Sequence, residues 1–146
     1  MWEADTVLYS VMTELLFGNE LVKKYYSLTG RSIDGSRIEF LITDYEENSI
    51  DPCVEAIDYY GKEHPEYSQG KSVTRNGNVF LTQCLVIYYP PGAVDSDDFY
   101  FGRNSTIEIL KCGDQKVSGE FNFIGKEVGS GATINITEGV FTDIEY

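Results

Sequence analysis

Apolar and polar residues alternate most regularly in the last third of the chain. In residues 117–123, every second residue is apolar or glycine and the intervening residues are polar, which is typical of a strand with one buried face. Residues 105–111, before this run, are rich in β-branched side chains, and residues 133–137 and 140–144 follow it. Glycine-containing polar segments separate the four runs, with Glu138-Gly139 between the last two. The pattern predicts a four-stranded antiparallel meander.

Alternation is looser in the first half of the chain. Residues 2–11, 21–29 and 37–43 carry apolar side chains at alternate positions, and glycine-containing turn signals separate them, which predicts three more strands. An amphipathic helix is the alternative for residues 12–24, because their apolar positions partly follow helical spacing. Gly18 would cost such a helix roughly 1 kcal/mol relative to alanine, so strands are the preferred interpretation.

Residues 46–77 break the strand pattern. Asp51 and Pro52 resemble a helix cap and a first helical turn, and Gly61 resembles a helix end, so a short helix is expected near residues 52–60. The remainder of this segment is polar, and loops of such length usually carry function or lack order. Residues 79–89 are then almost continuously apolar, which predicts a central strand that ends at two prolines.

Together these patterns predict an all-β fold. We expect one antiparallel β-domain over residues 1–146, with residues 46–77 as a loop and helix insertion. The domain is expected to be a β-sandwich or flattened barrel of about eight to ten strands with one short helix.

Composition narrows the classes of partner. Lys and Arg number 11 against 24 Asp and Glu, so the formal net charge is −13 at pH 7. Such a charge argues against nucleic-acid binding and against docking on anionic lipid, because both depend on clustered Lys and Arg. Hydrophobic residues make up 42% of the chain, which is typical of a globular protein.

Three cysteines, Cys53, Cys84 and Cys112, match no short metal-ligand spacing. They are compatible with three buried thiols, or with one disulfide and one remaining thiol. Because Cys84 lies in the predicted central strand, we expect it to be a partner in any disulfide that forms.

The sequence gives little support for a catalytic or metal-binding site. The single histidine, His64, lies in a polar loop without a recognisable nucleophile nearby, so no catalytic residue is predicted. Asp95, Asp97 and Asp98 form a carboxylate cluster that makes them weak calcium candidates, although they lack the order of a helical calcium loop. A second acidic cluster lies around residues 44–51. Since charge clusters are usually solvated faces, no metal or other cofactor is expected.

The many aromatic residues are more informative about function than the acidic clusters. Tyrosines occur in adjacent pairs, so one member of a pair is expected in the core and the other outside it. The predicted ligand contacts are Tyr59 and Tyr60, beside the long loop, and Phe99 and Tyr100, after the acidic cluster. An exposed aromatic surface among carboxylates suits recognition of a glycan or a protein.

Two segments near the C-terminus carry a recognisable pattern: Val-Ser-Gly-Glu-Phe-Asn-Phe at 117–123 and Thr-Ile-Asn-Ile-Thr-Glu-Gly-Val-Phe-Thr-Asp-Ile at 133–144. They resemble the closing hairpins of a family of small secreted lipoproteins of unknown function from Bacteroidota. Trp2-Glu3-Ala4 resembles its opening motif, and residues 28–40 resemble its second and third strands, whereas residues 46–77 match nothing in it. The resemblance implies an all-β fold and an exported protein, either an outer-membrane lipoprotein or a periplasmic one. It also implies a lipid anchor on a cysteine upstream of Trp2.

The sequence therefore predicts a non-enzymatic binding or structural module that recognises a glycan or protein ligand. The alternatives are a lipocalin-like carrier of a small apolar ligand and a small acidic inhibitor or immunity protein. A hydrolase using paired carboxylates is a more remote alternative. Met1 is followed directly by Trp2-Glu3-Ala4, with no basic region, apolar region or cleavage motif of a signal peptide. A gene that starts at Met1 would therefore contradict export and favour a cytosolic inhibitor or immunity protein.

Overall fold

The computed structural model describes residue 4 and residues 6–18, 20–47 and 52–145. These residues form ten strands and two short 3₁₀ turns, and none of them forms a helix long and apolar enough to cross a membrane. The strands are β1 (Thr6–Leu16), β2 (Leu21–Arg31), β3 (Arg37–Glu46), β4 (Asp58–Tyr60), β5 (Ser72–Arg75), β6 (Asn78–Leu81), β7 (Gln83–Tyr89), β8 (Tyr100–Gly113), β9 (Lys116–Glu127) and β10 (Thr133–Glu145). The 3₁₀ turns are η1 (Tyr67–Gln69) and η2 (Ser96–Asp98).

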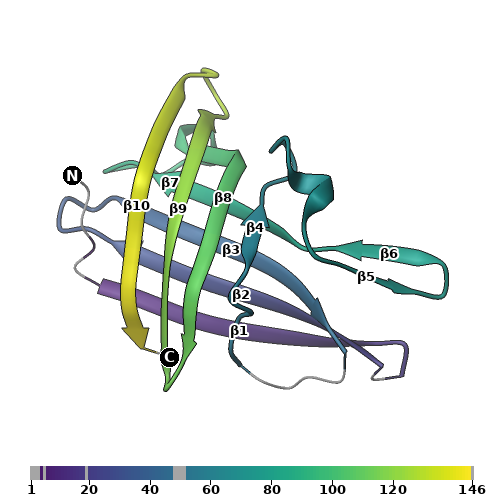
Figure 1. Cartoon of the computed structure of the whole chain (residues 1–146). Helices are drawn as coiled ribbons and strands as arrows, with labels where there is room; N and C mark the ends of the chain where they lie inside the picture. The colour runs from purple at the N-terminus through teal and green to yellow at the C-terminus, as the bar shows by residue number, and fades with distance from the viewer. Residues whose placement is uncertain (1–3, 5, 19, 48–51, 146) are drawn as a thin grey trace.

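One antiparallel sheet contains most of the chain. Its strand order is β1-β2-β3-β7-β8-β9-β10, with β4 paired to β8, and β5 and β6 form a separate two-stranded sheet. In Figure 1, strands β8, β9 and β10 cross in front of β1, β2 and β3, so the sheet folds over on itself into two layers. The ends of the path, β1 and β10, are not paired in the described residues, and the sheet is not closed into a barrel. The prediction of an all-β antiparallel fold is confirmed.

The core lies between the two layers and consists of alternate side chains from both. Phe40 of β3 packs against Phe121 of β9 and Phe141 of β10, with ring centroids 4.5 Å and 5.9 Å apart. Tyr26 is buried whereas its neighbour Tyr25 is exposed, because successive residues of a strand point to opposite faces. The prediction that one member of this tyrosine pair lies in the core is therefore confirmed. β7 lies at the centre of the strand order, but the single central strand predicted over residues 79–89 is divided: residues 78–81 form β6 of the second sheet, and residues 83–89 form β7.

The C-terminal meander has three strands where four were predicted. Glu138 and Gly139 do not turn the chain; they form an irregularity within β10, where the pairing with β9 shifts between Ile136 and Gly139. Glu138 has a φ of 57°, and its backbone N–H donates to the side-chain oxygen of Asn122 at 3.0 Å. A β-bulge and a tight turn use similar residues, which is why the sequence alone did not separate them.

The helix predicted near residues 52–60 is wrong. Residues 58–60 form β4, in which Tyr59 pairs with Ile107 of β8. Val54 and Tyr59 are both buried in the core, and this burial with strand pairing outweighs the local helix signals. Asp51, the expected helix cap, lies outside the described residues. The alternative helix over residues 12–24 is also wrong, because β1 and β2 form a hairpin there.

The disulfide joins Cys53 to Cys112, so the expectation that Cys84 is a partner is wrong. The Cα atoms of Cys53 and Cys112 are 5.6 Å apart, and the bridge ties the segment before β4 to the end of β8. Cys84 does lie in the central strand, but its side chain points into the core beneath β4. Its Sγ is 3.2 Å from the carbonyl oxygen of Tyr59, and no cysteine partner reaches it there.

Candidate functional site

A groove crosses the face of β1, β2, β3 and β7 that points away from the core, and we call it the outer-face groove. Its volume is about 540 Å³, within the usual range of small-ligand sites. Two adjacent cross-strand rows form its floor, each containing one residue from each of the four strands. The rows are Ser10, Ser27, Leu41 and Leu85, and Met12, Tyr25, Thr43 and Gln83.

Two large side chains of this floor are open to solvent. Met12 is 70% exposed and Tyr25 is 37% exposed. The hydroxyl of Tyr25 donates to Glu14 Oε2 at 3.2 Å, and the ammonium of Lys23 lies 4.8 Å from the centroid of the Tyr25 ring. These contacts hold the ring in place, so the groove offers a preorganised aromatic surface beside an adaptable thioether.

The rim of the groove comes from the chain just after β4 and from β8. Lys62 and Glu63 line one side and Arg103 lies beside them. The N–H of Glu63 donates to the carbonyl oxygen of Arg103 at 3.0 Å, and the N–H of Gly61 donates to the carbonyl oxygen of Ser105 at 2.9 Å. A Cβ atom at Gly61 would overlap the carbonyl group of Arg103, so this close approach requires glycine.

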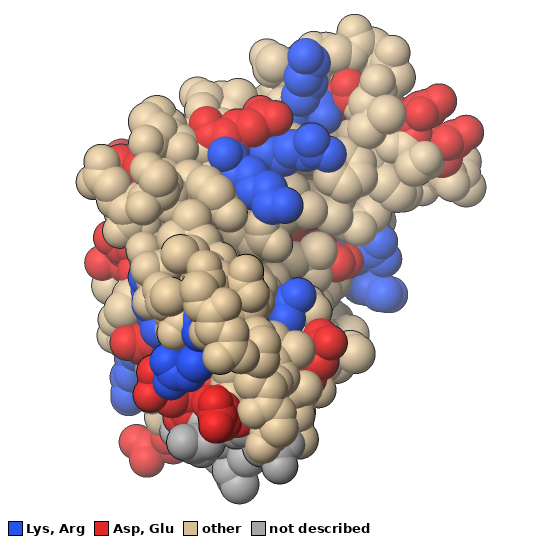
Figure 2. Space-filling model, turned by 90° about the vertical axis from the view of Figure 1, so that its right-hand side faces the viewer, with Lys and Arg blue, Asp and Glu red and all other residues tan. Residues whose placement is uncertain are grey.

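Two cations of the rim are available to a ligand. The ion pairs found among the described residues involve Lys24, Lys71 and Arg75, and none involves Lys62 or Arg103. Both of these side chains are exposed. On the face shown in Figure 2, several Lys and Arg side chains adjoin one another near the top of the view, with acidic side chains beside them.

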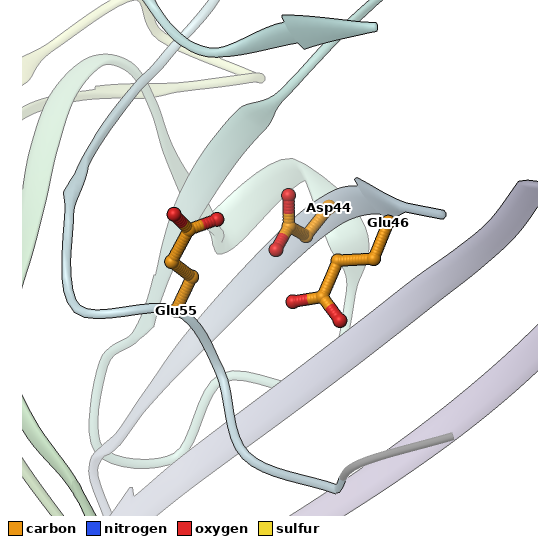
Figure 3. A group of neighbouring side chains, drawn as sticks. All are labelled: Asp44, Glu46 and Glu55. Carbon is orange, nitrogen blue, oxygen red and sulfur yellow. The ribbon is translucent and has the colours of Figure 1, made fainter. Parts of the chain in front are cut away.

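A second cluster contains three carboxylates, from Asp44, Glu46 and Glu55, whose oxygens face one another (Figure 3). Asp44 and Glu46 project from β3, and Glu55 projects from the segment before β4. Lys24 lies 2.7 Å from Glu46, and Lys71 lies 3.0 Å from Asp44 and also contacts Glu55. A cation at this point would compete with two lysine ammonium groups, so the arrangement is that of an ion-pair network.

Burial and neighbouring charges together shift the pKa values of this ion-pair network. Asp44 is fully buried, and this burial raises the pKa of its carboxyl group although Lys71 opposes the shift. Burial alone would lower the pKa of Lys71, but hydrogen bonds and charges from Glu55 and Asp44 outweigh it and the pKa is raised. The Tyr59 hydroxyl donates to the carbonyl oxygen of Glu55 at 3.1 Å and lies 3.3 Å from Asp44 Oδ2. Burial, followed by the charge of Asp44, raises the pKa of Tyr59.

A third feature is an apolar hollow between β1 and β10, which we call the edge cleft. Its volume is about 880 Å³. Phe40, Phe121 and Phe141 reach it from the core, and Val7 and Ile144 line it from the two edge strands. The cavity at the centre of the core is only about 10 Å³, so the interior between the layers is filled and the edge cleft opens at the side.

The predicted contact residues do not form one surface. Tyr59 is completely buried, so its expected role as a surface contact is wrong. Tyr60 is half-buried and its ring lies 4.9 Å from that of His64. Phe99 packs edge-on against Tyr89, with ring centroids 4.4 Å apart, and Tyr100 lies 6.1 Å from Tyr88. Phe99 and Tyr100 therefore belong to two separate, partly exposed aromatic pairs near the start of β8, whereas Tyr60 lies elsewhere, in β4.

The weak calcium candidates lie in and before the turn η2. Asp95 uses its carboxylate to accept from the N–H of Asp97 at 3.2 Å, and Asp97 and Asp98 are exposed. Among the described residues, Asp44, Glu46 and Glu55 are the group of acids whose ligand atoms converge, and the three aspartates are not part of it. Their spacing follows from turn formation, since Asp before a turn caps a free backbone N–H.

His64 and the free cysteine, Cys84, are both held in structural contacts. The Nδ1 atom of His64 accepts from the N–H of Glu66 at 3.0 Å, within a turn. Burial raises the pKa of the Cys84 thiol to about 12, so its nucleophilic thiolate is scarce at neutral pH. These two residues provide no activated pair.

The sequence did not identify Met12, Tyr25, Lys62 or Arg103 as site residues. Tyr25 carried a signal, because alternation placed one residue of the Tyr25-Tyr26 pair outside the core. Its grouping with Met12 depends on the register between β1 and β2, and the grouping with Arg103 depends on how β4 packs on β8. Comparison with known proteins adds nothing to this geometry: no family model, no curated protein and no solved structure matches the chain.

Proposed function

We propose that this protein is a non-enzymatic binding module whose ligand occupies the outer-face groove. The observation that carries the proposal is the composition of that groove. The groove combines a floor of apolar and small polar side chains with charged groups on one rim. Its volume of about 540 Å³ is within the range of small-ligand sites. Tyr, Ser and Met side chains of this kind are typical of adaptable contact surfaces.

The absence of enzymatic activity is part of the proposal. Support comes from His64 and Cys84, the two most reactive side-chain types for acid-base and nucleophilic chemistry, because each is held in a structural contact. The paired carboxylates of the Asp44 network support the same view, since lysines neutralise them.

We further propose that the protein works outside the cytoplasm, in the periplasm or on the outer membrane, with a lipid anchor on a cysteine upstream of Trp2. The Cys53–Cys112 disulfide supports an oxidising compartment, because such bridges are rare in the cytosol. A lipobox in the gene before Trp2 is the expected observation. A gene that begins at Met1 would contradict the proposal.

Binding is tested with a glycan array and a pull-down from cell-surface extracts. The variant Met12→Ala/Tyr25→Ala is expected to reduce binding at least tenfold, because it removes the two most exposed large side chains of the groove floor. The matched control is Phe99→Ala/Tyr100→Ala, which removes one partly exposed aromatic side chain from each of the two pairs near the start of β8. If only this control lost binding, the ligand would bind at Phe99 and Tyr100, as predicted from the sequence. The proposal that it occupies the outer-face groove would then be wrong.

A carrier of a small apolar ligand is the second candidate function, and the edge cleft favours it. This cleft is lined mainly by core side chains and backbone of β10, and Glu138 is the charged residue among its described lining residues. The fold is not a lipocalin-like barrel with an enclosed cavity, because the sheet is open and side chains fill the space between its two layers.

The carrier function predicts that an uncharged fluorescent apolar probe binds in the edge cleft. Val7→Glu is expected to weaken this binding about tenfold or more, because it places a carboxylate in the apolar lining. Leu110→Glu is the control, because Leu110 is exposed on β8 and does not line the cleft. Equal binding by the wild type and both variants would exclude the edge cleft as the carrier site.

A further inference from the structure

The rim of the outer-face groove differs in charge from the protein as a whole. The chain has a net charge of −13, yet Lys62 and Arg103 lie beside one carboxylate, that of Glu63, which leaves the rim with a local excess of one positive charge. Neither cation is engaged in an ion pair with a described residue. An anionic group of a ligand could therefore contact both Lys62 and Arg103 at this rim, although the protein as a whole is strongly acidic.

We infer that the ligand carries a single carboxylate, held between Lys62 and Arg103, on an otherwise uncharged sugar body; this inference rests on the proposed binding function. A single acidic group fits better than a polyanion, because the remaining surface charge repels additional negative groups. The planar guanidinium of Arg103 suits bidentate binding of a carboxylate, and the Lys62 ammonium adds a second charge-assisted hydrogen bond.

The groove floor favours a sugar over an acyl chain. It contains apolar and hydrogen-bonding side chains side by side, with Ser27 beside Leu41 and Thr43 beside Tyr25. A pyranose ring presents C–H faces and hydroxyl edges together, and so matches such a mixed surface. A fatty acid would leave the polar groups of the floor desolvated without hydrogen-bond partners, which is unfavourable. A short glycan containing one uronic acid has the required combination of groups.

The test compares neutral glycans, glycans with one uronic acid and multiply sulfated glycans on one array. The class with one uronic acid is expected to bind best. Arg103→Gln and Lys62→Gln are each expected to weaken that binding about tenfold, which corresponds to about 1.4 kcal/mol for each charge-assisted hydrogen bond. Lys111→Gln is the matched control, because Lys111 is an exposed cation that does not line the groove, and it is expected to leave binding unchanged.

Competition separates the two sources of a carboxylate. Free glucuronate is expected to displace the bound glycan, and laurate is expected not to. Displacement by laurate alone, or equal binding of neutral and acidic glycans, would overturn the inference. A different result would contradict the proposed function: if Met12→Ala/Tyr25→Ala still bound the glycan, the outer-face groove would not be the binding site. If binding required Tyr25 but was unchanged in Arg103→Gln and Lys62→Gln, the groove would remain the site and the inference of an acidic ligand would be wrong.

Discussion

Replacement of Cys53 and Cys112 by alanine is expected to lower the free energy of unfolding by about 4 kcal/mol. The two cysteines are 59 residues apart, and a cross-link that closes a loop of this length restricts the unfolded chain by about that amount. The bridge also holds the segment that carries Val54 into the core. Urea denaturation of the oxidised wild type and the double variant measures the difference, and the reduced wild type should behave like the variant.

The third cysteine provides the control for this prediction. Cys84→Ala should cost only about 1 kcal/mol, because it shortens one buried side chain and breaks no cross-link. Thiol titration of the denatured protein without reductant should find one reactive thiol, and titration after reduction should find three. Three reactive thiols before reduction, or a double variant as stable as Cys84→Ala, would show that the bridge does not form.

Lys71→Met is expected to destabilise the protein by about 3 kcal/mol at pH 7. Asp44 is fully buried and Lys71 lies 3.0 Å from its carboxylate, so the variant leaves a buried charge without its cation. The contact of Lys71 with the more exposed Glu55 contributes little, because solvent screens it. Lys111→Met, at an exposed position, is the control and is expected to change stability by less than about 0.5 kcal/mol.

The destabilisation by Lys71→Met should depend on pH in a defined direction. Burial already raises the folded-state pKa of Asp44 above the usual value of an aspartate, and loss of Lys71 is expected to raise this pKa further. A raised carboxyl pKa means that the folded state retains the proton more strongly, so stability falls as pH rises through the window between the unfolded and folded values. The deficit of the variant should therefore be smaller at pH 4 than at pH 7.

A second variant identifies the charge of Asp44 as the cause. Asp44→Asn/Lys71→Met replaces the buried carboxylate with a neutral amide, and it should recover part of the stability lost in Lys71→Met at pH 7. Denaturation curves of the three proteins at pH 4 and pH 7 give these differences. A deficit of equal size at both pH values, unchanged by Asp44→Asn, would show that packing of the Lys71 stem is responsible instead.

Alternation along the chain was enough to define the fold class and most of the strands. β2, β3, β8 and β9 follow runs whose side chains alternate between core and solvent, so their period of two is a direct consequence of one buried face. The strands were less well predicted where local signals have two meanings. Glu138-Gly139 fits a bulge as well as a turn, and residues 52–60 satisfy helix rules that burial of Tyr59 overrides.

The sequence by itself determined an acidic, tyrosine-rich, antiparallel β-protein, because composition and periodicity are properties of neighbouring residues. The tertiary structure decided which distant residues meet. Cys53 reaches Cys112 because β4 pairs with β8, and Lys71 reaches Asp44 because the chain returns across β3 before β5. The outer-face groove likewise depends on strand register and on the close approach of Gly61 to β8. Such contacts are set by the packing of whole strands, and no short segment of sequence encodes them.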